Sequence, residues 1–292
     1  MLNYDMPLYR PPSEGNNLII QATLGCHFNQ CSFCSMYKTK SYQARPLADV
    51  FADIDRAARV WPEASRVFLA DGDALTLPME SLRPILEKLA TTFPGLTRVS
   101  CYATPGDILK KTPEELQELK ALKLSLFYVG IETGAPKLLK KITKGASQKG
   151  IIEALQKARD NGLKVSATVI LGLGGKKYWQ DHIDGTVELL SKAPVTYLST
   201  LQLYLEEIAY DEFMTKFGEP FEAQDDMAVL KEQERLLTNI KPPAPVIFRS
   251  NHASNALALA GNLPKDQDRL VQQVQGAIAG VNAIRPSFMR RL

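Results

Sequence analysis

The stretch "TPEELQELKALKLSLFYVGIE" (112–132) has the pattern of a helix followed by a buried strand. Thr112 is expected to cap the helix, with Pro113 at its first position and Glu115 completing a capping box. Leucines then form an apolar stripe along the helix, at positions 116, 119 and 122. The run 124–132 is apolar without strict alternation, which is typical of a strand buried on both faces. The stretch therefore predicts one helix–strand unit of an α/β protein.

The same unit recurs along the chain. Further β-branched apolar runs occupy 18–24, 66–72, 98–104, 164–172, 196–205 and 246–250. Helices are expected at 46–60, 78–92, 147–162, 180–192, 226–240 and 265–279. This alternation predicts a parallel sheet with right-handed crossovers. The predicted fold is a partial (β/α)6-type TIM barrel with a C-terminal extension.

A proline cluster, "KPPAPV", suggests where the domains divide. Residues 1–240 are expected to form the partial barrel with a short N-terminal extension. Residues 241–292 are expected to add a strand and a helix that complete the barrel side and the substrate pocket.

Bulk composition limits the function classes. The 292 residues carry a formal net charge of +3, too small an excess to indicate a nucleic-acid partner. No apolar run approaches the ~20 residues that span a bilayer. The N-terminus lacks the charged and apolar regions of a secretory signal, so a cytoplasmic location with reduced thiols is expected.

Three of the four cysteines lie in "TLGCHFNQCSFCSMYK" (23–38), with the spacing Cys-x4-Cys-x2-Cys. The segment follows the first predicted strand, and loops leaving the carboxyl ends of barrel strands carry the chemistry. Three thiolates do not close a tetrahedral zinc site, and His27 is adjacent to Cys26, a position from which two side chains rarely reach one ion. A [4Fe–4S] cluster held by three cysteines keeps one iron open for another ligand. A zinc site or chance clustering is the alternative.

The segment resembles the cluster loop of the radical S-adenosylmethionine (SAM) superfamily, Cys-x3-Cys-x2-Cys with an aromatic residue before the last cysteine, here Phe33. It departs by one extra residue in the first spacing, as in branches related to the elongator catalytic subunit. The resemblance implies that Cys26, Cys31 and Cys34 hold a [4Fe–4S] cluster that binds SAM. It implies reductive cleavage of SAM to a 5′-deoxyadenosyl radical that abstracts hydrogen from an organic substrate.

The turn "FLADGDAL" (68–75) resembles the Gly-Gly-Glu-like turn that holds the methionine amino group in this superfamily. Gly72 and Asp73 take the key places, while Asp71 replaces a glycine. An ordinary turn after a strand is the alternative.

Two later stretches extend the resemblance. "FYVGIETGAPKLLKKITKG" (127–145) is similar to oxygen-independent coproporphyrinogen oxidases, which implies that Glu132 contacts the ribose and Lys144 the methionine carboxylate. For Lys144, membership of a solvated basic run is the alternative. "SATVILGLGG" (166–175) resembles the motif that supports adenine, which assigns Ile170 and Gly172 to that base and Thr168 to a ribose hydroxyl.

The substrate pocket is expected at "FRSNHASN" (248–255), a predicted strand-to-helix connection. Its substrate-binding candidates are Arg249, Ser250, Asn251 and Asn255. His252 is a catalytic candidate because a neutral imidazole can orient substrate or move a proton. The alternative is that Ser250 or Asn251 caps a following helix.

Tyr204 is the second catalytic candidate, in a stretch that replaces the Pro-Gly-Thr-Pro-like turn of relatives. Two other residues are expected to be structural: His182 as a solvated helix residue and Cys101 as a buried core residue. Loops at 105–112 and 174–182 are candidates for a lid over the radical site.

The expected partners are a small or medium organic substrate and a flavodoxin- or ferredoxin-like electron donor. A non-catalytic cluster- or tetrapyrrole-binding chaperone on the same fold is the alternative to an enzyme. A tRNA-modifying methylthiotransferase fits less well, because the sequence holds no further cysteine cluster.

Overall fold

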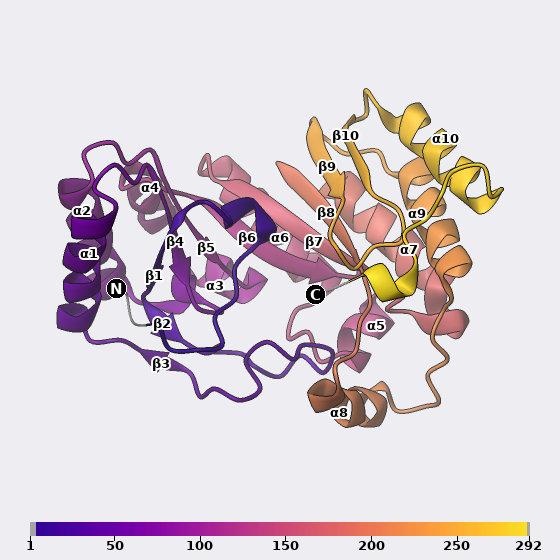
Figure 1. Ribbon diagram of the computed structural model, residues 1–292, viewed down its shortest axis with the longest axis horizontal. Helices are drawn as coiled ribbons and strands as arrows, with labels where there is room; N and C mark the ends of the chain where they lie inside the picture. Colours follow the sequence, from indigo (N-terminus) through magenta and orange to yellow (C-terminus); the bar gives the residue numbers. More distant parts are fainter. Residues whose placement is uncertain (1–3, 291–292) are drawn as a thin grey trace. The chain divides into compact units, whose positions relative to one another are not determined.

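A computed structural model describes residues 4–290, and its elements alternate between strands and helices along the chain (Figure 1). Eight strands form one sheet in the order β1-β4-β5-β6-β7-β8-β9-β10. The pairs β1–β4, β4–β5, β5–β6, β7–β8 and β8–β9 are parallel, and β9–β10 is antiparallel. The predicted α/β class with a mostly parallel, partial-barrel-type sheet is confirmed.

The first compact unit comprises the described residues up to Asn29, together with Cys34–Val129 and Lys157–Val165. Helix α1 packs against α2 and against β1 (Figure 1). Its elements are η1 (Pro12–Glu14), β1 (Leu18–Gln21), β2 (Thr23–Leu24), β3 (Gln43–Ala44), α1 (Leu47–Val60), β4 (Arg66–Ala70), η2 (Ala74–Thr76), α2 (Met79–Thr92), β5 (Arg98–Tyr102), α3 (Pro105–Lys110) and α4 (Pro113–Ala121). The Thr112–Glu115 capping box is present as predicted.

A buried carboxylate links the strands of this unit. Glu14 is fully buried, and its Oε1 accepts from Arg98 at 2.9 Å, Ser100 at 3.0 Å and the Tyr128 hydroxyl at 2.5 Å. Because a buried charge is costly unless paired and hydrogen-bonded, this network satisfies it within the unit.

The second unit comprises Gln30–Phe33, Gly130–Gln156 and Ser166 onward. Helix α9 packs against α7 and α10, and α10 also packs on β10. Three elements have residues in both units, namely β6 (Leu124–Glu132), α6 (Gln148–Asp160) and β7 (Lys164–Leu171). The remaining elements are α5 (Pro136–Lys141), α7 (Gly175–Lys192), β8 (Tyr197–Gln202), α8 (Glu207–Phe217), α9 (Asp226–Asn239), β9 (Val246–Ser250), β10 (Leu259–Leu263), α10 (Gln267–Ile278) and η3 (Ser287–Met289).

Three expectations about elements are wrong. The predicted lid loops at 105–112 and 174–182 are largely helical, because Thr104 caps α3 and α7 begins at Gly175. No helix follows β9 directly; an antiparallel strand, β10, comes first and α10 begins at Gln267. The residues of β10 alternate between buried and exposed, which is the period-2 signal of a strand with one covered face.

The second unit continues through residue 240 without a break, so the division into two units is a different one from the predicted domains. The assignment of 1–240 and 241–292 as domains stays a prediction. None of the helices within residues 4–290 combines the length and the apolar composition of a membrane span.

Candidate functional site

The cysteine segment lies in the connection between β2 and β3. These strands pair antiparallel, Thr23 with Ala44 and Leu24 with Gln43, so they bring the two ends of the connection together. Cys26, Cys31 and Cys34 are all partly exposed, and none of the four cysteines, all within the described residues, is in a disulfide. Accessible thiols on one short segment suit the formation of metal–thiolate bonds.

Within residues 4–290, no three His, Cys, Asp or Glu side chains stand ready as a metal-binding group. The fit of an iron–sulfur cluster therefore rests on the donor set, which is three thiols within nine residues. It also rests on a close approach at Gly72, where an added Cβ would lie 2.9 Å from the Cys26 Cβ and 2.7 Å from the Tyr37 ring. A side chain at position 72 would force Tyr37 or Cys26 to shift, so the turn after β4 packs directly on the first cysteine. Three thiols are the donors that a [4Fe–4S] cluster needs, so the residues present fit that group by their chemistry.

Cys101 differs from the other three cysteines. It is fully buried in β5, and burial raises the pKa of its thiol, as do the negative charges of Asp73 and Asp107. The complete burial of Cys101 confirms its predicted position in the core. A thiol that is held protonated there is a poor metal ligand.

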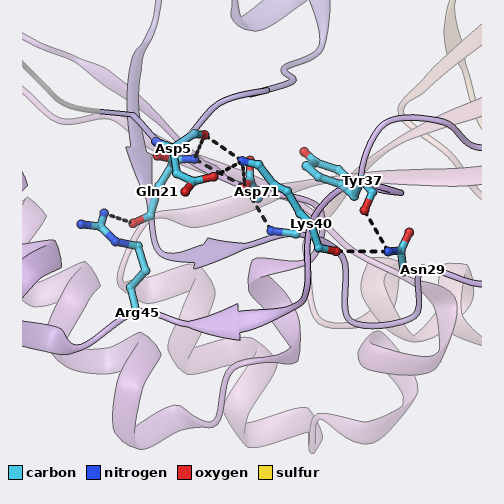
Figure 2. A network of polar contacts seen from close by, with 8 residues as sticks. Asp5, Gln21, Asn29, Tyr37, Lys40, Arg45 and Asp71 are labelled. Carbon is cyan, nitrogen blue, oxygen red and sulfur yellow. Dashed lines mark hydrogen bonds and ion pairs between the residues drawn. The ribbon is translucent and has the colours of Figure 1, made fainter. Parts of the chain in front are cut away.

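Asn29 and Tyr37 fix the backbone of the cysteine segment between its two ends. Asn29 Nδ2 donates to the Tyr37 carbonyl at 2.9 Å and to the Lys40 carbonyl at 3.4 Å (Figure 2). The Tyr37 ring is buried edge-on against Tyr9, and burial, followed by the charge of Asp71, raises the pKa of its hydroxyl. His27 is exposed and packs edge-on against Tyr42.

The turn after β4 holds Asp71, Gly72 and Asp73. Both carboxylates are fully buried. Burial raises the pKa of Asp71, while Lys40, Gly25 and Gln21 oppose that shift. Burial and then the charge of Asp73 raise the pKa of Tyr42 to about 12. Asp73 is thus a buried acid, and its predicted contact with the methionine amino group stays a prediction.

Glu132 ends β6 with a positive φ of 66°, a conformation that costs free energy for a residue with a side chain. Its carboxylate folds back over Gly130, where an added Cβ would lie 1.8 Å from Oε1. Lys144 Nζ donates to the same oxygen at 2.9 Å. The alternative of Lys144 as a solvated residue is wrong, because its side chain is only 10% exposed and is paired with Glu132.

His182 holds the exit of β7. The Nε2 lies 3.0 Å from the Ile170 carbonyl, so it carries the proton, and Nδ1 accepts from the Thr133 hydroxyl at 2.8 Å. Burial lowers the pKa of this imidazole to about 4, so it is neutral near pH 7. The prediction of a solvated His182 is wrong: it lies on the buried face of α7, four residues after Tyr178 and four before Thr186.

Glu232 of α9 fixes the same turn. Its Oε2 accepts from the Gly172 N–H at 2.6 Å, and Oε1 accepts from Gln224 at 2.9 Å. Burial raises the pKa of this carboxyl to about 8, against the effect of both donors. The Glu232 Oε2 also lies 4.0 Å from the His182 Nε2. Both side chains are largely neutral at pH 7, so the two do not form an ion pair.

The bonds from His182 to Ile170 and from Gly172 to Glu232 fix the backbone of the turn that is predicted to support adenine. Gly172 has a φ of 82°, which favours glycine, and its carbonyl accepts from Gly175 at 3.0 Å. Thr168 is partly exposed on β7, on the same strand face as Ile170. Adenine and ribose contacts by Thr168, Ile170 and Gly172 stay predictions.

Asn255 and Ser250 are buried next to the end of β8. Asn255 accepts from the Gln202 N–H at 2.8 Å and donates to the Thr200 carbonyl at 2.8 Å and to Ser250 at 2.9 Å. Both line a cavity of about 20 Å³, roughly the space of one water molecule. Their hydrogen bonds hold the end of β8, and their substrate role stays a prediction.

The remaining substrate candidates are more exposed. Arg249 is exposed on β9 and donates to the Phe248 carbonyl at 2.7 Å, and Asn251 is exposed just after that strand. The alternative that Ser250 or Asn251 caps a helix is wrong, because no helix begins there.

His252 accepts from the Ser254 N–H through Nδ1 at 3.2 Å, which leaves the proton of a neutral ring on Nε2. Burial and then Arg285 lower its pKa, so it is neutral near pH 7. The Tyr204 side chain is 61% exposed. Catalysis by His252 and Tyr204 stays a prediction.

Phe33, the aromatic residue before the last cysteine of the segment, packs on an apolar cluster that includes Phe213.

The family follows from the sequence as a whole. The model of the Radical SAM superfamily matches residues 20–190, more than half of the chain. The chain belongs to this superfamily. The matched range includes the three-cysteine segment and the turns after β4, β6 and β7.

Individual relatives are distant. The chain is 26% identical over 183 residues to a Methanocaldococcus jannaschii protein named "Putative methylthiotransferase", covering 58% of this chain and 39% of that protein. It is 20% identical to the heme chaperone HemW of Bacillus subtilis, covering 60% and 48%. The chain thus spans less than half the length of these two relatives. Among solved structures, methylornithine synthase PylB superposes with a TM-score of 0.54 at 14% identity, over 77% of this chain and 63% of that one.

Sequence reasoning missed four side chains that organise these turns, namely Lys40, Asp71, His182 and Glu232. In the sequence, Asp71 stands out only as a departure from the Gly-Gly-Glu-like pattern. For His182, the available signal is its four-residue spacing from Tyr178 on one side and from Thr186 on the other. Lys40 and Glu232 carry no local signal, because their partners lie 31 and 60 residues away.

Proposed function

We propose that the chain is a radical SAM enzyme that acts on a small or medium organic substrate. The observation that carries the proposal is the superfamily match across a segment with three accessible thiols at cluster-binding spacing. We assign Cys26, Cys31 and Cys34 to a [4Fe–4S] cluster. When bound, this cluster and SAM supply a 5′-deoxyadenosyl radical, the chemistry that the resemblance implies.

The chain's own residues would bind and orient the cofactor. Asp73 would accept from the methionine ammonium and Lys144 would donate to its carboxylate. Glu132 would accept from a ribose hydroxyl, a contact that competes with its bond to Lys144. The rigid Ile170–Gly172 turn would support adenine.

The finer branch is also a proposal. The widened first cysteine spacing and the stretch 127–145 favour the branch related to the elongator catalytic subunit and the oxygen-independent coproporphyrinogen oxidases. A flavodoxin- or ferredoxin-like protein would supply the electron. The similarity to a heme chaperone supports one competing function, a cluster- or tetrapyrrole-binding chaperone.

Release of 5′-deoxyadenosine separates the two functions. The wild-type chain, reconstituted anaerobically and reduced with dithionite, is expected to convert SAM to methionine and 5′-deoxyadenosine, measured by chromatography. Cys34→Ala, treated identically, is the control and should form none, since one cluster ligand is lost. An iron-loaded wild type that binds heme and leaves SAM intact contradicts the enzyme and favours the chaperone.

Replacing Asp73 tests the cofactor assignment. Asp73→Ala is expected to keep its iron but weaken SAM affinity by about 1.5–3 kcal/mol, because a hydrogen bond between two charged groups is lost. Equilibrium binding of SAM to the reconstituted protein measures this change.

The matched control is Asp107→Asn, which alters another buried carboxylate of the same unit. It should bind SAM like the wild type. Equal SAM affinity in Asp73→Ala and wild type removes Asp73 from the site.

A further inference from the structure

One carboxylate connects the two ends of the cysteine segment. Asp71 Oδ2 accepts from the Gly25 N–H at 3.1 Å, directly before the first cysteine. The same oxygen accepts from Lys40 Nζ at 3.2 Å, six residues after the last cysteine (Figure 2). Gly25 and Lys40 therefore enclose all three cysteines, and both are bonded to one atom of the turn after β4.

The pair is buried, so its bonds are strong and costly to break. The Asp71 side chain is fully buried and that of Lys40 is 7% exposed. Removing one partner of a buried ion pair leaves an uncompensated charge, which is strongly destabilising. Gln21 adds a third donor to the same oxygen at 3.4 Å, and Lys40 also binds the Asp5 carboxylate at 2.7 Å.

A second contact fixes the first end of the segment. The Gly72 N–H donates to the Gly25 carbonyl at 3.1 Å, so both backbone groups of Gly25 are bound by consecutive residues. Gly25 has a φ of 68°, and an added Cβ would lie 3.0 Å from the Ser41 carbonyl oxygen. The backbone direction into Cys26 is thereby determined.

We propose that Asp71 and Lys40 are positioning residues that clamp the cysteine segment and hold its thiols in the arrangement that retains the cluster. The proposal rests on the proposed function, because it takes the three cysteines as cluster ligands. The aspartate that departs from the Gly-Gly-Glu-like pattern thus has a use of its own: it fixes the loop, while Asp73 remains for SAM.

The test compares iron retention and loop protection in Asp71→Asn, Lys40→Met and Lys40→Arg. After reconstitution, Asp71→Asn and Lys40→Met should lose iron to a chelator at least about tenfold faster than the wild type, the factor expected when one charge-assisted bond is lost. Lys40→Arg keeps the charge and should stay near the wild-type rate. In the cluster-free chain, amide hydrogen exchange across residues 25–40 should be faster in the first two variants only.

Glu14→Gln is the matched control, since it also neutralises a fully buried, paired carboxylate of the first unit, but one bonded to Arg98, Ser100 and Tyr128 and not to Gly25 or Lys40. It should lower the melting temperature yet release iron at the wild-type rate. If it speeds iron loss as much as Asp71→Asn, the effect is general destabilisation and the clamp is refuted.

The outcomes distinguish this proposal from the proposed function. Iron-loaded Asp71→Asn and Lys40→Met with wild-type retention and exchange refute the clamp alone. A wild type that takes up no iron refutes the cluster assignment and this proposal with it. Faster exchange without faster iron loss also refutes the proposal, because the clamp would not act on the cluster.

Discussion

Replacing Cys26, Cys31 and Cys34 together by alanine is expected to abolish iron binding. The wild type should take up about four iron atoms per chain on anaerobic reconstitution, and the triple variant almost none. The reason is that thiolate sulfur is the ligand on which such clusters depend, and the only other cysteine is buried in β5. Iron and sulfide assays with visible absorption measure the difference.

Cys101→Ala is the matched control for the triple variant. It removes a thiol whose pKa is raised by burial, so it should keep full iron content while losing some stability from the cavity in the core. Stoichiometric zinc in the wild type, without iron–sulfur absorption, would contradict the cluster and restore the zinc alternative.

The sheet could be predicted because its strands carry their own signal. The run 124–132 and the run 246–250 are observed with the predicted bounds, as β6 and β9. The run of β6 is apolar and largely buried, as expected for a strand covered on both faces. In β9, Arg249 is exposed, so this strand is covered less completely than its apolar start suggests. β10 could not be predicted, because its run contains Gly261 and follows a polar stretch that indicates a helix start.

The turns that we propose to bind the cofactor could be predicted only as positions along the chain. Their residues lie next to recognisable strand ends, which placed Asp73, Glu132 and Gly172 at β4, β6 and β7. What fixes these turns comes from distant elements: Glu232 reaches Gly172 across 60 residues, and His182 reaches Thr133 across 49. Such pairs depend on tertiary packing, which no local pattern encodes.

Replacing Glu232 is expected to give the largest loss of stability. Glu232→Ala leaves the buried Gly172 N–H without its acceptor and opens a cavity beneath the turn, which together should cost about 2–4 kcal/mol of unfolding free energy. Glu232→Gln keeps an amide oxygen for Gly172 and should cost much less. Chemical denaturation of the cluster-free chain at pH 6.5 measures both, and equal stability of Glu232→Ala and wild type contradicts the assigned role.

The same carboxyl predicts how stability changes with pH. Burial raises the pKa of Glu232 to about 8 from its ordinary value of 4.5, so the folded chain binds the extra proton between these values and stability falls as pH rises. Burial lowers the pKa of His182 to about 4 from 6.5, so its contribution rises with pH and ends near 6.5. The two opposite slopes largely cancel below pH 6.5, and above it only Glu232 of this pair still titrates.

Wild-type stability should therefore drop by about 1.6 kcal/mol between pH 6.5 and 8, because the slope is 1.36 kcal/mol per pH unit well below the pKa and half of that at pH 8. Glu232→Gln has no ionisable group at this position and should lose that slope. Glu188→Gln, an exposed carboxylate on α7, should keep it. Parallel pH profiles for wild type and Glu232→Gln would mean that Glu232 is ionised throughout, with the Gly172 and Gln224 donors outweighing its burial.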